Sequence, residues 1–247
     1  METPVGGSAP PAKPETQDLF AGIAGPAYSR RAKLLSLGQE PRWHRMLVRR
    51  LSVGPDDHVL DVATGTGAVA ERLVLDRRCR VTGIDQNPHM LAAAGLRLDE
   101  AGIAQRVTLM EGEAEHLPFP DATFDGLSVT YLLRYVDDPA GVLRELVRVM
   151  KPGAPFASLE FGVPPRALPR AAWRLYTGAL LPAGGAIVGG RRWWHVGRFL
   201  HRSIPDFYDR HPLPALLDLH RAAGLSELRV RRPSFGGAVV ITGVRTP

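Results

Sequence analysis

The stretch VLDVATGTG, residues 59–67, decides the fold because it joins an apolar strand, a carboxylate and a glycine-rich turn that opens a helix. Gly65 and Gly67 let the backbone approach a ligand closely, and the first turn of a helix offers N–H groups without a partner in the helix. We therefore expect a nucleotide-like ligand at this turn. A tight turn that binds nothing, with Asp61 as a cap, is the alternative.

The same turn fits the G-x-G-x-x-G/A fingerprint of dinucleotide-binding proteins, since Ala70 occupies its last position. Asp61 favours a different ligand, because a carboxylate near the turn repels a pyrophosphate and attracts an ammonium group. S-adenosylmethionine carries both an ammonium and a sulfonium group. An NAD-dependent oxidoreductase is the alternative that the fingerprint leaves open.

Around this stretch, short runs rich in Val, Ile and Leu alternate with longer helical patterns, which is typical of βαβ units and a parallel sheet. Strands are expected at residues 58–63, 80–85, 106–111, 124–133 and 156–162, and a closing hairpin at 226–232 and 237–244. Helices are expected at residues 66–75, 88–101, 139–150 and 213–223. The sequence thus predicts an α/β fold whose seven-stranded, mostly parallel sheet ends in an antiparallel hairpin.

A single domain with accessory segments is expected. Residues 1–17 are rich in Pro and Gly and lack the apolar core of a signal peptide, so we interpret them as a disordered tail. The domain then covers residues 18–247. Its parts are a helical lid at 18–52, a cofactor-binding core at 53–163, an aromatic and basic cap insertion at 164–210, and a closing helix and hairpin at 211–247.

Composition excludes several classes of protein. Cys79 is the single cysteine among 247 residues, which leaves no intramolecular disulfide and no multi-cysteine zinc site, and favours a reducing cytosol. We expect no metal cofactor. The longest uncharged stretch, residues 175–190, holds Pro182 and five glycines and is too short and broken to span a bilayer.

Two further strand ends carry side chains suited to an adenosine. Asp85 ends the second strand, where a carboxylate accepts hydrogen bonds from both ribose hydroxyls. The alternative is that Asp85 and Asn87 cap the next helix. Glu113, in the loop after the third strand, is placed to bind the adenine amino group, with a solvated loop as its alternative.

Together these motifs resemble the class I S-adenosylmethionine-dependent methyltransferases, which are Rossmann-like, and more narrowly the ubiquinone/menaquinone-biosynthesis C-methyltransferase family. The resemblance covers about residues 20–242, through VLDVATGTG, GIDQNPHML, GEAEHLPFPDATFD, LLRYVDD, LRELVRVMKPG and LEF. It implies S-adenosyl-L-methionine as the cofactor. The cofactor-binding residues that it implies are Tyr28, Asp61, Thr64, Gly65, Gly67, Asp85, Gln86, Glu113 and Ala114.

The resemblance also implies C-methylation of a quinol, a small aromatic acceptor. Arg134 would stabilise the phenolate that forms when the acceptor loses its phenolic proton, and Tyr135 would share that hydrogen bond. The family typically has Asn in place of Tyr135 and of Ala32, so O- or N-methylation of another phenolic molecule is the alternative. A second alternative is a non-catalytic accessory protein that binds S-adenosylmethionine or a quinone.

Other residues have weaker claims to the chemistry. For Arg134, the alternative to catalysis is a surface ion pair with Asp137 or Asp138. The side chains able to act as general bases, none of which we assign to catalysis, are His116, His195, His201 and His211.

The cap insertion mixes aromatic side chains with arginines, and residues 163–247 hold 13 arginines against four acidic residues. This composition fits a cap over the substrate pocket and also a weak contact with an anionic membrane surface. No nucleic-acid-binding module is recognised, so no nucleic-acid partner is expected. We expect a cytoplasmic protein, peripheral at the inner face of the membrane, and leave a homodimer open.

Overall fold

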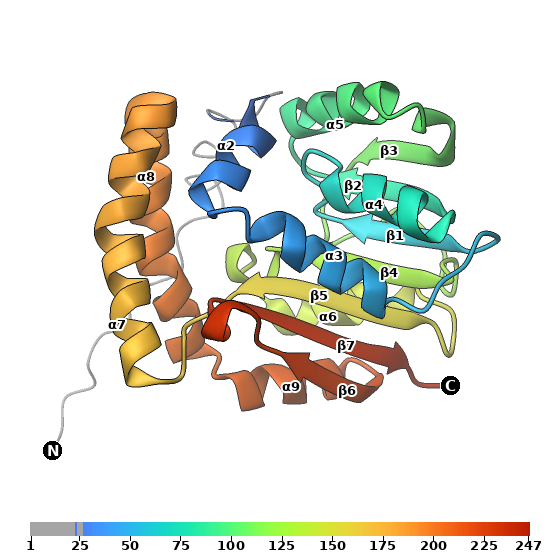
Figure 1. Cartoon of the computed structure of the whole chain (residues 1–247). Coiled ribbons are helices and arrows are strands. Elements are labelled where there is room, and N and C mark those ends of the chain that lie inside the picture. Colours follow the sequence, from blue (N-terminus) through green and yellow to red (C-terminus); the bar gives the residue numbers. More distant parts are fainter. Residues whose placement is uncertain (1–22, 24–26) are drawn as a thin grey trace, which may run out of the picture.

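The computed structural model describes Ile23 and residues 27–247; the expected tail, residues 1–17, lies outside them. Within the described residues, seven strands form one sheet in the order β3-β2-β1-β4-β5-β7-β6, with helices on both faces (Figure 1). The strands are β1 (His58–Val62), β2 (Arg80–Asp85), β3 (Val107–Glu111), β4 (Gly126–Thr130), β5 (Pro155–Phe161), β6 (Leu225–Arg231) and β7 (Ala238–Arg245). β1 to β5 are parallel and β7 is antiparallel to both its neighbours, which confirms the predicted sheet.

The helices flank this sheet and the site. They are α2 (Tyr28–Leu35), α3 (Glu40–Arg50), α4 (Ala68–Arg77), α5 (Pro88–Glu100), α6 (Pro139–Arg148), α7 (Ala167–Leu175), α8 (Leu181–Arg210) and α9 (Leu213–Ala222). The helices expected in the core, now α4, α5, α6 and α9, all form. Pro at the first helical position and Asp138 as cap explain the start of α6, because the Asp138 carboxylate accepts from Gly141 N at 2.9 Å.

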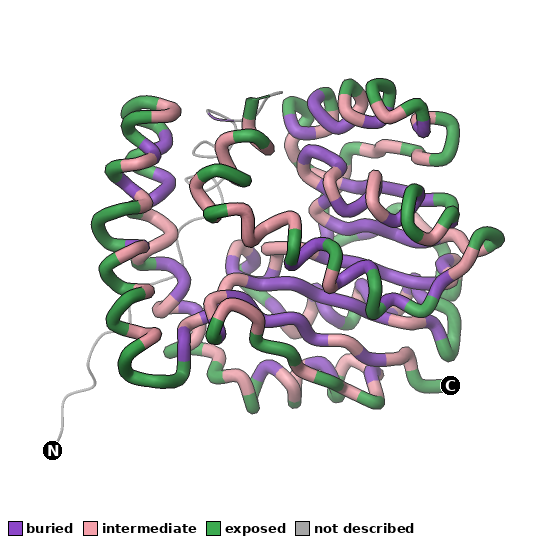
Figure 2. The backbone as a smooth tube through the Cα atoms, viewed as in Figure 1, coloured by how far each residue is buried: buried purple, intermediate pink, exposed green. Residues whose placement is uncertain are grey.

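The core lies on both faces of the sheet, and Figure 2 shows the buried strands between the helices. The central strands are buried along nearly their whole length, as expected when helices cover both faces of a parallel sheet. On one face α6 contributes a buried stripe of Val142, Leu143, Leu146 and Val147. On the other face α3 and α4 pack together over β1 and β5.

The predicted bounds of the fourth strand are wrong at both ends. Residues 124–133 were expected, whereas β4 covers only Gly126–Thr130. Phe124 makes one isolated bridge, to Met150. At the other end Tyr131 has φ +55°, a left-handed conformation that interrupts an extended strand, and a short 3-10 helix, Leu133–Tyr135, follows.

The cap insertion forms a helical hairpin beside the carboxyl ends of the strands (Figure 1), and the end of α8 packs into the core through Phe207. α7 continues through a π-helical segment, Tyr176–Leu180, into α8, and the chain reverses at Gly190, where φ is +73°. Glycine adopts this conformation without steric cost. No helix in the described part of the chain is long and apolar enough to cross a membrane.

Two helices of the expected lid connect the sheet to the hairpin. α3 is fixed to the closing turn, since Trp43 Nε1 donates to Ser234 Oγ at 2.9 Å. α2 lies against the hairpin, where the rings of Tyr28 and Trp193 are 5.6 Å apart and the Tyr176 hydroxyl donates to Leu35 O. The lid therefore closes the space between the sheet and the hairpin.

Candidate active site

A cavity of about 1050 Å³ opens at the carboxyl ends of the parallel strands, where open α/β sheets bind ligands. The hairpin faces these strand ends from the opposite side (Figure 1). Loops after β1, β2, β3 and β4 line the cavity together with α2, α3 and the hairpin. The hairpin residues in its wall include Trp173, Tyr176, Trp193, Val196, Leu200 and Ile204.

The glycine-rich turn joins β1 to α4. Gly65 and Gly67 have φ of +55° and +73°, which favour glycine. A Cβ on Gly67 would lie 3.1 Å from Ala94 Cβ, so this glycine lets α4 pack against α5. Thr64, Gly65 and Thr66 line the cavity, whereas Gly67 does not.

Asp61 lies beneath this turn and does not line the cavity. Its side chain is 1% exposed; Oδ2 accepts from Thr64 Oγ1 at 2.7 Å and Oδ1 accepts from Ser128 Oγ at 2.6 Å. Burial raises the pKa of this carboxyl to about 6. The carboxylate therefore ties the turn to β4 rather than facing a ligand directly.

Asp85 lines the cavity and also holds the turn in place. It accepts hydrogen bonds from Gly65 N at 2.8 Å and from Asn87 N at 2.9 Å, and burial raises its pKa. The cap of α5 is Asn87, which accepts from His89 N at 3.0 Å, so Asp85 is not the helix cap. Each carboxylate oxygen has a second acceptor site, which suits the two hydroxyls of a ribose.

The other expected cofactor residues divide into two groups. Tyr28, Gln86 and Ala114 line the cavity. Glu113 is exposed and outside its wall, and the carboxyl side chain that lines the cavity in this loop is Glu115.

Arg134 is buried, with 3% of its surface exposed, and makes no ion pair with Asp137 or Asp138 among the described residues. The surface ion pair is therefore the wrong interpretation. The Arg134 guanidinium lies over the rings of Tyr135 and Phe161, at 4.6 and 5.3 Å, and donates through Nη2 to the Tyr135 hydroxyl. Tyr135 and Phe161 line the cavity, whereas Arg134 does not. The Arg134 guanidinium therefore lies behind these two aromatic side chains and does not contact the cavity directly.

Glu160, at the end of β5, is a buried carboxyl close to this cation. Its Oε1 accepts from Leu133 N at 2.9 Å, which fixes the 3-10 turn carrying Arg134. Burial raises the pKa of Glu160 to about 7, and the positive charge of Arg134 opposes that rise.

Among the polar side chains of the cavity wall that the sequence interpretation missed are Glu40, His44 and Tyr131. His44 is 7% exposed, and neither its Nε2 nor the Tyr131 hydroxyl has a hydrogen-bond partner among the described residues. Glu40 Oε1 lies 3.9 Å from His44 Nε2. The available signal was the i, i+4 spacing of the pair beside Trp43, on the apolar face of α3.

These features fit S-adenosylmethionine. The backbone at Gly65 is open to the cavity, Asp85 offers acceptors for a ribose, and His44 of α3 and Tyr131 after β4 carry unpartnered polar atoms and line the same cavity. The fold is that of class I S-adenosylmethionine-dependent methyltransferases. It matches an S-adenosylmethionine-dependent methyltransferase of Thermotoga maritima, described as a possible histamine N-methyltransferase, with a TM-score of 0.60 and 20% identity over 92% of this chain and 98% of that one. It also matches the [4+2]-cyclase SpnF, with a TM-score of 0.65 and 18% identity over 98% of this chain and 99% of that one.

The chain belongs to the ubiE/COQ5 methyltransferase family, whose profile matches residues 12–245. It is 34% identical to the demethylmenaquinone methyltransferase of Thermus thermophilus, over 92% of this chain and all of that one. It is 31% identical to the demethylmenaquinone methyltransferase of Lactiplantibacillus plantarum, over 93% and 95% of the two chains. The protein is an S-adenosylmethionine-dependent methyltransferase, which excludes the NAD-dependent alternative.

Proposed function

We propose that this enzyme methylates a ring carbon of a quinol in quinone biosynthesis, with a demethylmenaquinol or demethylubiquinol-type ring as acceptor. The observation that carries the proposal is the lining of the cavity. The cavity that the glycine-rich turn lines is also lined by Trp173, Tyr176 and Trp193 of the hairpin, which suits a flat ring with an apolar tail. The names of the relatives support the same acceptor class.

When bound, S-adenosylmethionine supplies an activated methyl group. The protein has to align the acceptor carbon with that group and exclude water, which the lid and hairpin do by covering the strand ends. Transfer of the phenolic proton to a water molecule directs electron density onto the ring carbon. That carbon bonds to the methyl carbon as the S–CH3 bond breaks, the sulfur keeps the electron pair and leaves as a thioether, and loss of the ring proton to water restores the aromatic ring. We assign the phenolic oxygen to the Tyr135 hydroxyl, whose partner Arg134 supplies positive charge from behind.

The decisive experiment follows the methyl group. Protein is incubated with cofactor labelled with 13C in its methyl group and a demethylated quinol, and the product is examined by 13C NMR. A methyl signal in the C-methyl region shows a C–C bond, while a signal in the O-methyl or N-methyl region favours the O- or N-methyltransferase, which Tyr135 in place of the family's Asn keeps open. No transfer to the quinol would overturn the proposed acceptor. Asp85→Ala, which removes the expected ribose acceptor, is the control and should transfer little or no methyl group.

We also propose that the outer surface of the hairpin contacts an anionic membrane, where a prenylated quinol would reside. Exposed apolar side chains, among them Leu168, Leu175 and Ile187, alternate there with exposed arginines. Apolar insertion and attraction to anionic headgroups act together at such surfaces. That the protein forms a homodimer and binds no nucleic acid stays a prediction.

A further inference from the structure

We propose that Glu40 and His44 form the receptor for the amino-acid end of S-adenosylmethionine, with Glu40 binding the ammonium group and His44 donating to the carboxylate. This inference rests on the cofactor assignment and is independent of the acceptor.

The spacing of the two side chains matches an amino-acid zwitterion. Glu40 and His44 occupy successive turns of α3, and Glu40 Oε1 lies 3.9 Å from His44 Nε2. Both side chains line the cavity. Because the ammonium and carboxylate of an α-amino acid are attached to the same carbon, they need an acceptor and a donor a few ångströms apart. Glu40 and His44 present that pair.

The pair lines the same cavity as the glycine-rich turn that opens α4, and Arg97 acts on both. Ser29 Oγ and Thr66 Oγ1 are 2.7 Å apart, which joins the lid to this turn. Arg97 Nε donates to Thr66 O at 2.8 Å, and the same arginine acts electrostatically on both Glu40 and His44. An adenosine anchored at Asp85 would therefore extend its amino-acid end past the turn toward α3.

Other carboxylates near the turn are already engaged. Both oxygens of Asp61 accept hydroxyl hydrogen bonds, and Asp85 accepts two backbone N–H groups. Glu71 is paired with Arg97 Nη1 at 2.9 Å. Among the described residues, the Glu40 carboxylate has His44 as its one ion-pair neighbour. Burial raises the pKa of Glu40 to about 7, so an ammonium group beside it would relieve an unfavourable charge.

His44 is suited to donate as a neutral imidazole. Burial, with the nearby charges of Arg72 and Arg97, lowers its pKa to about 4. Its Nε2 has no hydrogen-bond partner in the described part of the chain, and a buried polar atom in that state costs free energy. A ligand carboxylate would supply the missing partner.

The test compares two nucleosides by calorimetry. S-adenosylhomocysteine has the amino-acid end, whereas 5′-methylthioadenosine has the same nucleoside and sulfur without it. Glu40→Gln and His44→Leu should each weaken S-adenosylhomocysteine binding about 10- to 100-fold, as loss of a charge-assisted hydrogen bond does, and leave 5′-methylthioadenosine binding unchanged. Glu115→Gln, a second cavity-lining carboxyl, is the matched control and should affect both nucleosides equally.

Unchanged S-adenosylhomocysteine affinity in Glu40→Gln, or equal losses for the two nucleosides, would overturn the assignment. Retained binding of 5′-methylthioadenosine shows that each variant is folded, so a folding defect cannot imitate the expected result. Wild-type protein that binds neither nucleoside would overturn the cofactor site itself. Failure of methyl transfer to a quinol, with selective nucleoside binding intact, would affect only the proposed acceptor.

Discussion

Inside the cavity wall, the guanidinium of Arg134 is held by two aromatic rings and by the phenol of Tyr135. A desolvated cation over an aromatic ring gains about 2 kcal/mol, and the hydrogen bond orients the phenol toward the cavity. Tyr135 lines the cavity and Arg134 does not. We therefore expect Tyr135 to contact the acceptor oxygen and Arg134 to act on that oxygen through Tyr135.

Arg134→Ala should lower kcat about 100- to 1000-fold with little change in affinity for S-adenosylhomocysteine, because the lost charge acts mainly in the transition state. Arg134→Lys should restore only part of the rate, since an ammonium cannot reproduce the planar guanidinium. Tyr135→Phe should show a similar loss, and adding Arg134→Ala to it should cost little more. Independent, additive losses in this double-mutant cycle would show that Arg134 does not act through Tyr135.

Asp61→Ala should destabilise the protein even without cofactor. The change removes the hydrogen-bond acceptor of two buried hydroxyls, those of Thr64 and Ser128. Each buried hydroxyl left without a partner lowers the free energy of unfolding by roughly 1–3 kcal/mol. Urea unfolding of the cofactor-free protein should therefore show a loss of about 2–4 kcal/mol, and S-adenosylhomocysteine should bind more weakly because the turn is loosened. Ser128→Ala, which removes one of the two bonds, should cost less. An Asp61→Ala variant of wild-type stability with weakened binding would instead place Asp61 against the ligand.

The sequence identifies site residues at the ends of strands well and site residues on the lid helices poorly. The positions of Asp85 and Gly65 in the site are predictable, because parallel strands bring their carboxyl ends to one edge of the sheet. Glu40 and His44 do not, because an i, i+4 pair on a short amphipathic helix gives no indication of which element covers it. Their proximity to the turn depends on the packing of α3 over α4.

Among the elements, the hairpin presents the exposed apolar and basic surface. Each arginine near an anionic surface contributes on the order of 1 kcal/mol, screened by salt. The protein should sediment with vesicles containing phosphatidylglycerol at low ionic strength and less at physiological strength. Reversing two exposed charges, Arg191→Glu and Arg198→Glu, should abolish most of this binding.

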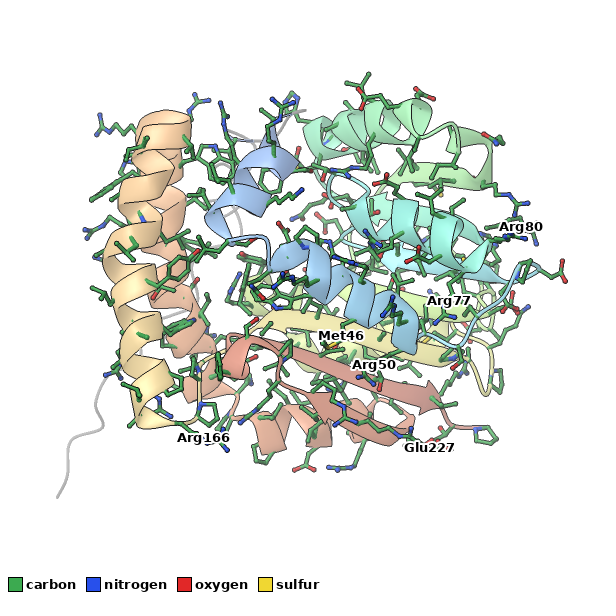
Figure 3. All side chains as sticks on the ribbon, in the orientation of Figure 1. Met46, Arg50, Arg77, Arg80, Arg166 and Glu227 are labelled. Carbon is green, nitrogen blue, oxygen red and sulfur yellow. The ribbon has the colours of Figure 1, made fainter. Side chains whose placement is uncertain are left out.

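The matched control is Arg80→Glu, an exposed arginine at the far side of the sheet from the hairpin (Figure 3). This substitution also replaces a positive charge by a negative one, and it should leave sedimentation of the protein with phosphatidylglycerol vesicles nearly unchanged. Equal binding of the wild type to neutral and anionic vesicles would contradict the membrane proposal and leave the hairpin as a pocket cap alone.

Core elements were predictable from the sequence because apolar runs of strand length alternate with helical stripes, as in α6. The hairpin was not predicted as helix. Residues 175–190 hold Pro182 and five glycines, which have poor helix propensity. Pro182 lies in the first turn of α8, where proline is tolerated, and the hairpin is held by packing against α2 rather than by propensity.

Buried carboxyl groups contribute to the pH dependence of the whole protein's stability. Burial raises the pKa of Glu160 from 4.5 to about 7, so the folded state holds its proton over a range in which the unfolded state has lost it. The contribution of Glu160 to the free energy of unfolding should therefore fall as pH rises from about 4.5 through 7, whereas the lowered pKa of His44 contributes in the opposite direction below about 6.5. Glu40 and Asp61 act in the same direction as Glu160.

Glu160→Gln should remove the contribution of Glu160, which is on the order of 3 kcal/mol for a shift of this size. Urea unfolding of cofactor-free protein at pH 5 and pH 8 measures it. The variant should lose less stability between these two values than the wild type does. An identical fall in both proteins would show that Glu160 titrates normally in the folded state.

The position of β7 in the sheet has a consequence for synthesis on the ribosome. β7 lies between β5 and β6, although β6 and α9 precede it along the chain. The edge of β5 therefore stays unpaired while the hairpin, α9 and β6 emerge, and β6 can join the sheet only after β7 has been made. An open edge of this kind is a template for pairing with another chain. The nascent protein thus depends on its last strand to close the region most exposed to aggregation.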